Sequence, residues 1–135
     1  MTIPERLAWA KHLRTQSAPK SYAMPTKYRN KITICDGLRF DSRLEADRYL
    51  ELKALQASGE VAYFLRQVPL HIATGVKLVV DFMVVRHDCV CGGVVISWED
   101  TKGYMTSTAR TKIAVAQDKY RIKIRILKRA DVRKS

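Results

Sequence analysis

Hydrophobic and polar positions alternate with the period of β-strands in several stretches of the chain from about residue 31 onward. Residues 32–34 and 38–40 flank Asp36-Gly37, a pair that favours the tight turn of a β-hairpin. Residues 61–72 also have strand character, but Pro69 restricts this strand to a sheet edge or a bulge. The pattern predicts three further strands, over residues 76–86, 94–101 and 121–127.

Two stretches follow the helical period instead. Ser42 stands three residues before Glu45, as in a capping box, and the apolar repeat that follows ends at Ser58-Gly59. A second helix is expected over residues 106–118, where Ala109, Ile113 and Ala116 form one stripe. The predicted order is hairpin, helix, three strands, helix and strand. This order indicates an α/β fold with a mixed central sheet flanked by helices.

Length and composition limit the class of protein. A chain of 135 residues with 47% hydrophobic residues is expected to form one domain. We divide it into an N-terminal helix, arm and linker (1–26), a folded domain (27–128) and a basic, frayed tail (129–135). No apolar run is long enough to span a bilayer, so no membrane partner is expected. Three cysteines, an odd number, favour a reducing, cytoplasmic location over a disulfide framework.

The charge of the chain points to a polyanionic partner. The formal net charge is +12, from 25 Lys and Arg against 13 Asp and Glu. Residues 1–35 and 103–135 carry net charges of +6 and +8, whereas residues 36–102 carry −2. Basic ends that hold phosphates, with carboxylates kept for chemistry in the centre, would produce this distribution.

Carboxylates interrupt two strands that should be apolar. Asp81 stands within the run Leu78–Val85, where a carboxylate is costly unless it is paired or binds a metal. The next strand ends in Asp100-Thr101-Lys102, where an acid and an amine share one face and Glu99 faces the other way. Such a pair can hold a cation and a water. The alternatives are an Asp81 paired with a buried Arg or capping a loop, and an ordinary salt bridge at the strand end.

These residues resemble the PD-(D/E)XK nuclease superfamily, with Asp81 as the first acid, Asp100-Thr101-Lys102 as the D-x-K, and Val80 in place of the proline. The predicted order of elements is also similar to the restriction-endonuclease-like core of that superfamily, αβββαβ. An uncharacterised phage-encoded, resolvase-like endonuclease family is similar in four ordered strings over residues 28–127. They are F-D-S-x-x-E-A-x-R-Y-L from Phe40, Q-x-P from Gln67, D-F from Asp81 and E-D-x-K-G from Glu99.

The resemblance implies a metal-dependent DNA endonuclease that acts on branched or recombination-type DNA, as Holliday junction resolvases do. It implies Mg²⁺, with Mn²⁺ as a substitute, held by Asp81, Asp100, the Thr101 carbonyl and Glu45. Lys102 would orient or deprotonate the attacking water. Cutting two strands implies a homodimer, and a phage origin implies the cytoplasm of a host cell. Glu45 has a second interpretation as the N3 residue of the capping box.

Several other residues have open roles. Gln67 orders a water or phosphate near the site, or closes an edge strand. Arg110, Lys112 and Lys119 follow the D-x-K strand and are candidate phosphate contacts, with Lys112 the first choice; the alternative is a solvated helix face. His87, Cys89 and Cys91 would supply three zinc ligands, but a structural zinc site usually shows two ligand pairs. The rival function is a non-catalytic nucleic-acid-binding protein on a nuclease-like fold.

Overall fold

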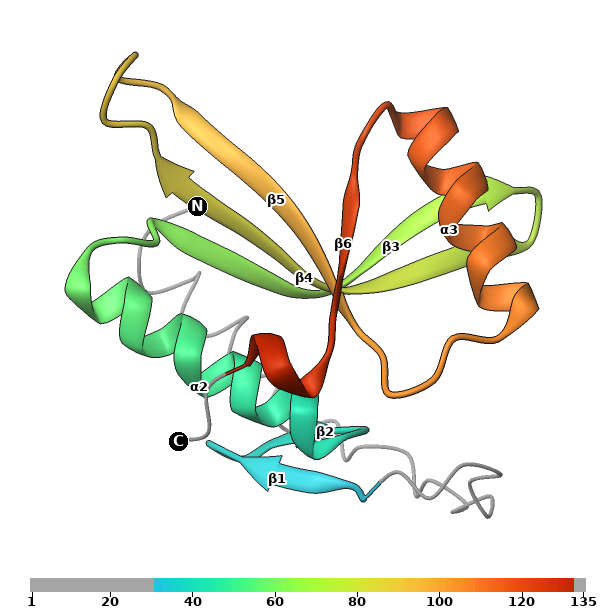
Figure 1. Ribbon diagram of the computed structural model, residues 1–135, viewed down its shortest axis with the longest axis horizontal. Helices are drawn as coiled ribbons and strands as arrows, with labels where there is room; N and C mark the ends of the chain where they lie inside the picture. Colours follow the sequence, from blue (N-terminus) through green and yellow to red (C-terminus); the bar gives the residue numbers. More distant parts are fainter. Residues whose placement is uncertain (1–30, 133–135) are drawn as a thin grey trace, which may run out of the picture.

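The computed structural model describes residues 31–132, and its elements follow the predicted order (Figure 1). The fold is mixed α/β, as the sequence predicts. A short hairpin precedes the first helix, three strands follow it, and a second helix leads to the last strand and a 3-10 turn. The elements are β1 (Thr33–Cys35), β2 (Leu38–Phe40), α2 (Arg43–Ser58), β3 (Tyr63–Ala73), β4 (Val76–His87), β5 (Val94–Thr101), α3 (Ser107–Tyr120), β6 (Ile124–Leu127) and η1 (Arg129–Asp131).

The central sheet has four strands in the order β3-β4-β5-β6. The β3–β4 and β4–β5 pairs are antiparallel, whereas β5 and β6 are parallel because α3 connects them as a crossover. Pro69 lies in β3, which is an edge strand, and the register shifts between His71 and Ala73. Both the edge position and the irregularity agree with the sequence prediction. The two strands β1 and β2 form a separate antiparallel pair.

The predicted start and end of α2 are confirmed. The Ser42 hydroxyl accepts a hydrogen bond from the Glu45 backbone N–H at 3.1 Å, and Gly59 ends the helix with a φ of 87°. In the preceding hairpin, Asp36 and Gly37 have φ values of 51° and 73°, the positive values that a tight two-residue turn requires. Local sequence therefore sets the start of α2, and with it the position of Glu45.

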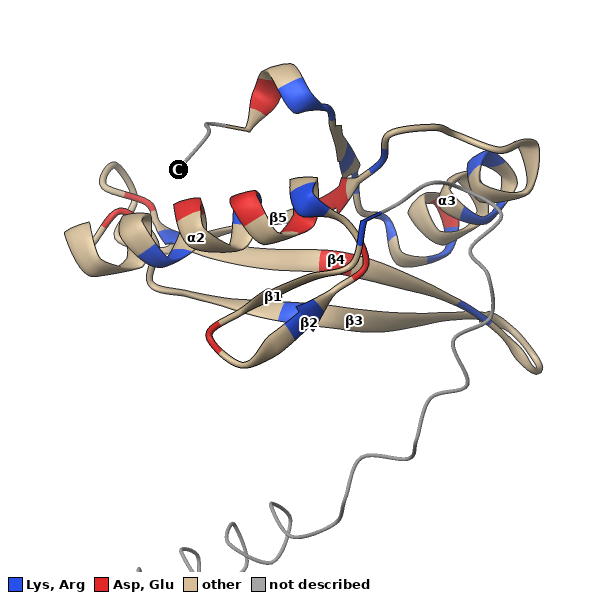
Figure 2. Cartoon of the chain, turned by 90° about the horizontal axis from the view of Figure 1, so that it is seen from below, with Lys and Arg blue, Asp and Glu red and all other residues tan. Residues whose placement is uncertain are grey.

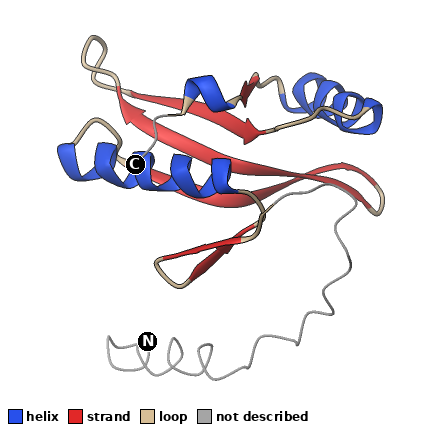
Figure 3. Cartoon of the chain, turned by 60° about the horizontal axis from the view of Figure 1, so that its bottom comes forward, coloured by secondary structure: helices blue, strands red, loops and turns tan. Residues whose placement is uncertain are grey.

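Two hydrophobic clusters hold α2 and α3 against the sheet, and Figure 3 shows α2 lying along one face of it. The cluster beneath α2 contains Phe82 and Val84 of β4, together with Phe40, Ala46, Tyr49, Leu52 and Val61. The cluster beneath α3 contains Leu78 and Val80 of β4, together with Leu70, Ile113, Ala116 and Ile124. Asp81 stands between Val80 and Phe82, so it lies where the two clusters meet along β4.

The C-terminal part of the chain differs from the prediction in two respects. The last strand begins at Ile124 instead of residue 121, because α3 continues to Tyr120 and Arg121 takes the left-handed conformation that ends it. The frayed tail is also wrong for residues 129–132. Arg129 pairs with Asp47, and Val132 is buried at 4% exposure, so packing and an ion pair hold this segment in place. No helix within residues 31–132 is long and apolar enough to cross a membrane.

Candidate active site

The strands β4 and β5 separate at the two aspartates. Their backbone pairing runs from His87 and Val94 to Phe82 and Glu99, so Asp81 and Asp100 occupy the next position. At this position the Asp81 side chain replaces the backbone hydrogen bonds between the strands. Its Oδ2 accepts hydrogen bonds from the Thr101 backbone N–H at 2.8 Å and from the Thr101 hydroxyl at 2.7 Å. The structure therefore brings Asp81 and the Asp100-Thr101-Lys102 segment together at a fork in the sheet. Within residues 31–132 the hydrogen-bond partners of Asp81 are Thr101 and Gln67, and no Arg of this part of the chain pairs with it.

Asp100 is buried beside Asp81 and Lys102. Its side chain is 1% exposed, and within residues 31–132 neither carboxylate oxygen accepts a hydrogen bond. The nearest cation is Lys102, whose Nζ lies 3.3 Å from Oδ2 as an ion pair. Burial and the nearby charge of Asp81 raise the pKa of Asp100 to about 7, although Lys102 acts in the opposite direction. A carboxylate in this position favours a proton or a metal cation as its partner.

Glu45 reaches the same fork from α2. Its backbone N–H caps the helix through Ser42, while its carboxylate turns toward the sheet, so the capping contact leaves the side chain available. The amide nitrogen of Gln67 bridges the two acids, at 2.7 Å from Glu45 Oε1 and 3.3 Å from Asp81 Oδ1. Burial, followed by the charge of Asp81, raises the pKa of Glu45 to about 7. Figure 2 shows acidic segments on α2, β4 and β5 close to one another and basic segments on α3.

A buried ion pair joins α2, which carries Glu45, to β5, which carries Asp100. Arg48 donates from Nε to Glu99 Oε2 and from Nη2 to Glu99 Oε1, both at 2.8 Å, and from Nη1 to Glu51 at 2.8 Å. Arg48 stands three residues after Glu45 on α2, and Glu99 directly precedes Asp100 on β5. The bidentate pair therefore fixes the helix against the strand on the opposite face from Asp100. Sequence alternation indicates the orientation of Glu99, but nothing in the sequence identifies Arg48 as its partner.

The candidate phosphate contacts lie in different surroundings. Arg110 lines a hollow together with Lys102, next to the fork. The Lys119 ammonium instead donates to the backbone carbonyls of His71 at 2.8 Å and Ile72 at 3.3 Å, where it ties α3 to β3. Lys112 is half-buried and does not line the hollow. Contact with nucleic acid stays a prediction for all three cations.

Comparison with known proteins gives a family. Residues 25–131 match the model of a family described as "Protein of unknown function (DUF1064)". The chain belongs to this family. No curated protein and no solved structure matches the DUF1064 chain. The fork of β4 and β5 lies within the matched segment, and so do all the candidate site residues.

The acids of the DUF1064 chain suit Mg²⁺ in their chemistry, although they do not form a complete cage. No group of three or more His, Cys, Asp or Glu within residues 31–132 is arranged to hold a metal ion. Mg²⁺, however, is usually held by one or two carboxylates together with water and substrate phosphates. Asp81 and Asp100 supply two such carboxylates, and the buried Asp100 oxygens lack other donors. Gln67 links Glu45 to Asp81, so Glu45 is considered with these two acids.

Of the three candidate zinc ligands, which the sequence does not favour as a site, Cys91 has another contact. His87 ends β4, and Cys89 and Cys91 are exposed in the turn that follows. The Cys91 thiol donates to Asp88 Oδ2 at 2.8 Å, and Val90 N–H donates to Asp88 Oδ1 at 2.9 Å. These contacts organise the turn around Asp88. Cys35, the remaining thiol, lies in β1 and packs against the cluster beneath α2.

The raised pKa values predict how the stability of the DUF1064 chain depends on pH. Glu45 and Asp100 bind protons more tightly in the folded state than at their usual pKa values of 4.5 and 3.8. Their contribution is fully present below those usual values and is lost as the pH rises through about 7. In EDTA, we therefore expect the midpoint of thermal unfolding to fall between pH 5 and about 7.5. Added Mg²⁺ is expected to raise the midpoint more at pH 8 than at pH 5.

Melts of the full chain in EDTA and in Mg²⁺, taken across this range, provide the measurement. Asp100→Asn removes one of the two titrating groups and should flatten the pH dependence in EDTA. A midpoint that rises with pH in EDTA would show that these carboxyls are not the ones that dominate the titration.

Proposed function

We propose that this protein is a Mg²⁺-dependent DNA endonuclease that hydrolyses phosphodiester bonds at the fork of β4 and β5. The observation that carries the proposal is the Asp100 carboxyl, which is 1% exposed and lies beside the Asp81 carboxyl, with Lys102 at 3.3 Å as its one described ion-pair partner. A purely structural acid at 1% exposure would be expected to have its oxygens satisfied by the protein. Lys102 reaches only Oδ2 of Asp100, so a bound metal cation would supply the further positive charge that two adjacent buried carboxyls favour.

In this proposal Asp81 and Asp100 hold the cation, with Glu45 and the Thr101 carbonyl completing the set. When bound, Mg²⁺ polarises the phosphate and neutralises its developing negative charge. Lys102 Nζ, 3.3 Å from Asp100, orients the attacking water and stabilises the charge on the phosphate oxygens. The water oxygen forms a bond to phosphorus as the water loses a proton to solvent, the opposite P–O bond breaks, and the leaving oxygen takes up a proton from solvent.

The substrate class rests on charge and on the superfamily resemblance. A net charge of +12 favours DNA as the polyanion, and its phosphates would meet Arg110, Lys112 and Lys119 as well as Gln67. The resolvase-like resemblance points to branched or recombination intermediates in the cytoplasm of a host cell. Cutting both strands of a junction requires two sites, so we also propose a homodimer. The predicted arm, residues 1–26, lies outside the described residues.

A cleavage assay tests the proposal. The full chain is incubated with labelled four-way junction, duplex and single-stranded DNA of equal length in Mg²⁺, Mn²⁺ or EDTA. We expect products with either metal, most with the junction, and none in EDTA. Binding to these substrates without cleavage in either metal would favour the rival function, a non-catalytic nucleic-acid-binding protein. Paired cuts on opposite arms of a junction within one binding event would support the homodimer.

A further inference from the structure

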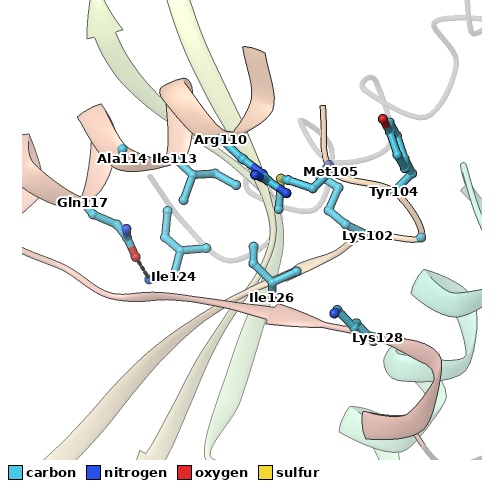
Figure 4. A pocket seen from close by; sticks show the side chains of 11 residues that line it. Lys102, Tyr104, Met105, Arg110, Ile113, Ala114, Gln117, Ile124, Ile126 and Lys128 are labelled. Carbon is cyan, nitrogen blue, oxygen red and sulfur yellow. Dashed lines mark hydrogen bonds between the residues drawn. The ribbon is translucent and has the colours of Figure 1, made fainter. Parts of the chain in front are cut away.

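A hollow with an apolar floor opens beside the fork, between α3, β6 and the loop that follows β5 (Figure 4). Its volume is about 560 Å³, within the range typical of pockets for small organic groups. Ile113, Ile124 and Ile126 form the floor, and Ala114 of α3 faces the same space. The hollow is therefore much larger than a single ion requires, and its floor suits a flat apolar face.

The rim of this hollow is cationic. Lys102, Arg110 and Lys128 line it, and among residues 31–132 no Asp or Glu does. An apolar floor surrounded by three cations complements a nucleotide, whose base presents a π-face and whose backbone carries phosphates. Gln117 also lines the hollow, and its Oε1 accepts the Ile124 N–H at 2.8 Å, which leaves the NH₂ group to meet a base edge. An acidic peptide would match the cations but not the apolar floor.

The hollow shares one residue with the proposed catalytic group. Lys102 Nζ lies 3.3 Å from Asp100 Oδ2, and the same side chain lines the hollow. A base in the hollow would therefore belong to a nucleotide at or next to the phosphate that is cut. In intact duplex DNA that base is stacked and paired, and withdrawing it costs a few kcal/mol. A base that is already unpaired enters without this cost.

We propose that the hollow binds one unpaired nucleobase of a DNA strand, so that the site selects DNA with an unpaired nucleotide beside the cut. This inference rests on the proposed function for its choice of DNA and for the position of the cut. It adds a binding subsite and a reason for preferring branched or interrupted DNA over continuous duplex.

Binding in EDTA tests the subsite separately from catalysis. The probes are two labelled duplexes that differ by one extra nucleotide, 2-aminopurine, which is unpaired in the first duplex and absent from the second. We expect the full chain to bind the bulged duplex about tenfold more tightly than the continuous one, which corresponds to about 1.4 kcal/mol. The 2-aminopurine fluorescence is expected to change on binding. The readout is the ratio of the two dissociation constants.

Ala114→Phe fills the hollow from an exposed helix position and should bring this ratio close to one. Ala54→Phe is the matched control, because Ala54 is exposed on α2 and does not line the hollow. It should keep the wild-type ratio. If Ala114→Phe melts abnormally, Ala114→Met fills part of the same space with a side chain that favours helices.

Equal binding of the two duplexes by the wild-type chain would overturn the inference. So would a preference that survives Ala114→Phe in a folded protein, or a stronger preference for the same bulge in an RNA duplex. A preference that responds to Ala114→Phe in a protein that never cleaves DNA would retain the subsite and reject the nuclease. Cleavage of DNA by a chain that shows no preference for the bulged duplex would retain the nuclease and reject the subsite.

Discussion

Asp81→Asn is expected to abolish DNA cleavage in Mg²⁺ and to leave the protein folded. The several kcal/mol that a catalytic cation contributes correspond to a rate loss of about a thousandfold or more when a ligand is removed. The asparagine oxygen still accepts the Thr101 hydrogen bonds, which in the wild type are 2.8 Å and 2.7 Å long. Removing the negative charge also relieves repulsion with Glu45 and Asp100, whose pKa values Asp81 helps to raise. The melting midpoint in EDTA should therefore hold or rise.

Cleavage of labelled junction and a thermal melt on the same preparation measure both effects. Asp118→Asn is the matched control, because Asp118 is exposed on α3, where its only described ion pair is with Arg121. This control should keep wild-type cleavage. If Asp81→Asn still cuts DNA at the wild-type rate, Asp81 is not part of the site. If it unfolds, the Asp81 contacts with Thr101 are structural and the catalytic argument loses its first acid.

Arg48→Met should produce the largest loss of stability that we predict. The substitution leaves the Glu99 carboxylate, whose side chain is 0% exposed, without its bidentate partner. Breaking a buried ion pair from one side typically costs about 3–5 kcal/mol. The double substitution Arg48→Met with Glu99→Leu removes both charges and should recover much of that loss. Urea unfolding monitored by circular dichroism gives the free energies.

Arg39→Met provides a control for this pair. Arg39 and Asp41 form an ion pair of 3.9 Å with side chains 50% and 82% exposed, so its loss should change stability little. A free-energy change for Arg48→Met no larger than that for Arg39→Met would show that water reaches Glu99. A double variant as unstable as the single one would indicate that Arg48 acts through its packing or through Glu51 instead.

The convergence of the acids could be predicted because it depends on short-range rules. A turn of a few residues between two strands forces an antiparallel register, and that register places Asp81 level with Asp100. The start of α2 is likewise a local matter, because Ser42 and Glu45 are three residues apart. This capping pattern does not predict the role of the Glu45 carboxylate, because the contact with Ser42 uses only the Glu45 backbone N–H.

Other parts of the site depend on contacts that have no local signal. Gln67 bridges Glu45 and Asp81. Its backbone has a φ of 52°, an uncommon conformation for glutamine that the neighbouring sequence does not predict. Arg48 and Glu99 are 51 positions apart, so only the assembled fold pairs them. The sequence pattern predicts the start of β6 at residue 121 instead of Ile124 for a related reason. Alternation continued through residues 121–123, but the end of α3 took Arg121 out of the strand.

The position of Asp81 along β4 has a consequence for how such a protein changes over generations. Its two neighbours, Val80 and Phe82, are both fully buried, and each belongs to a different hydrophobic cluster. A change of side-chain volume in either cluster is therefore passed to Asp81 across one peptide unit. The acids themselves need not vary for the chemistry to be adjusted. Substitutions in the apolar residues beneath α2 or α3 are therefore expected to shift the Asp81 carboxylate, so the geometry of the three acids can change while the acids themselves stay the same.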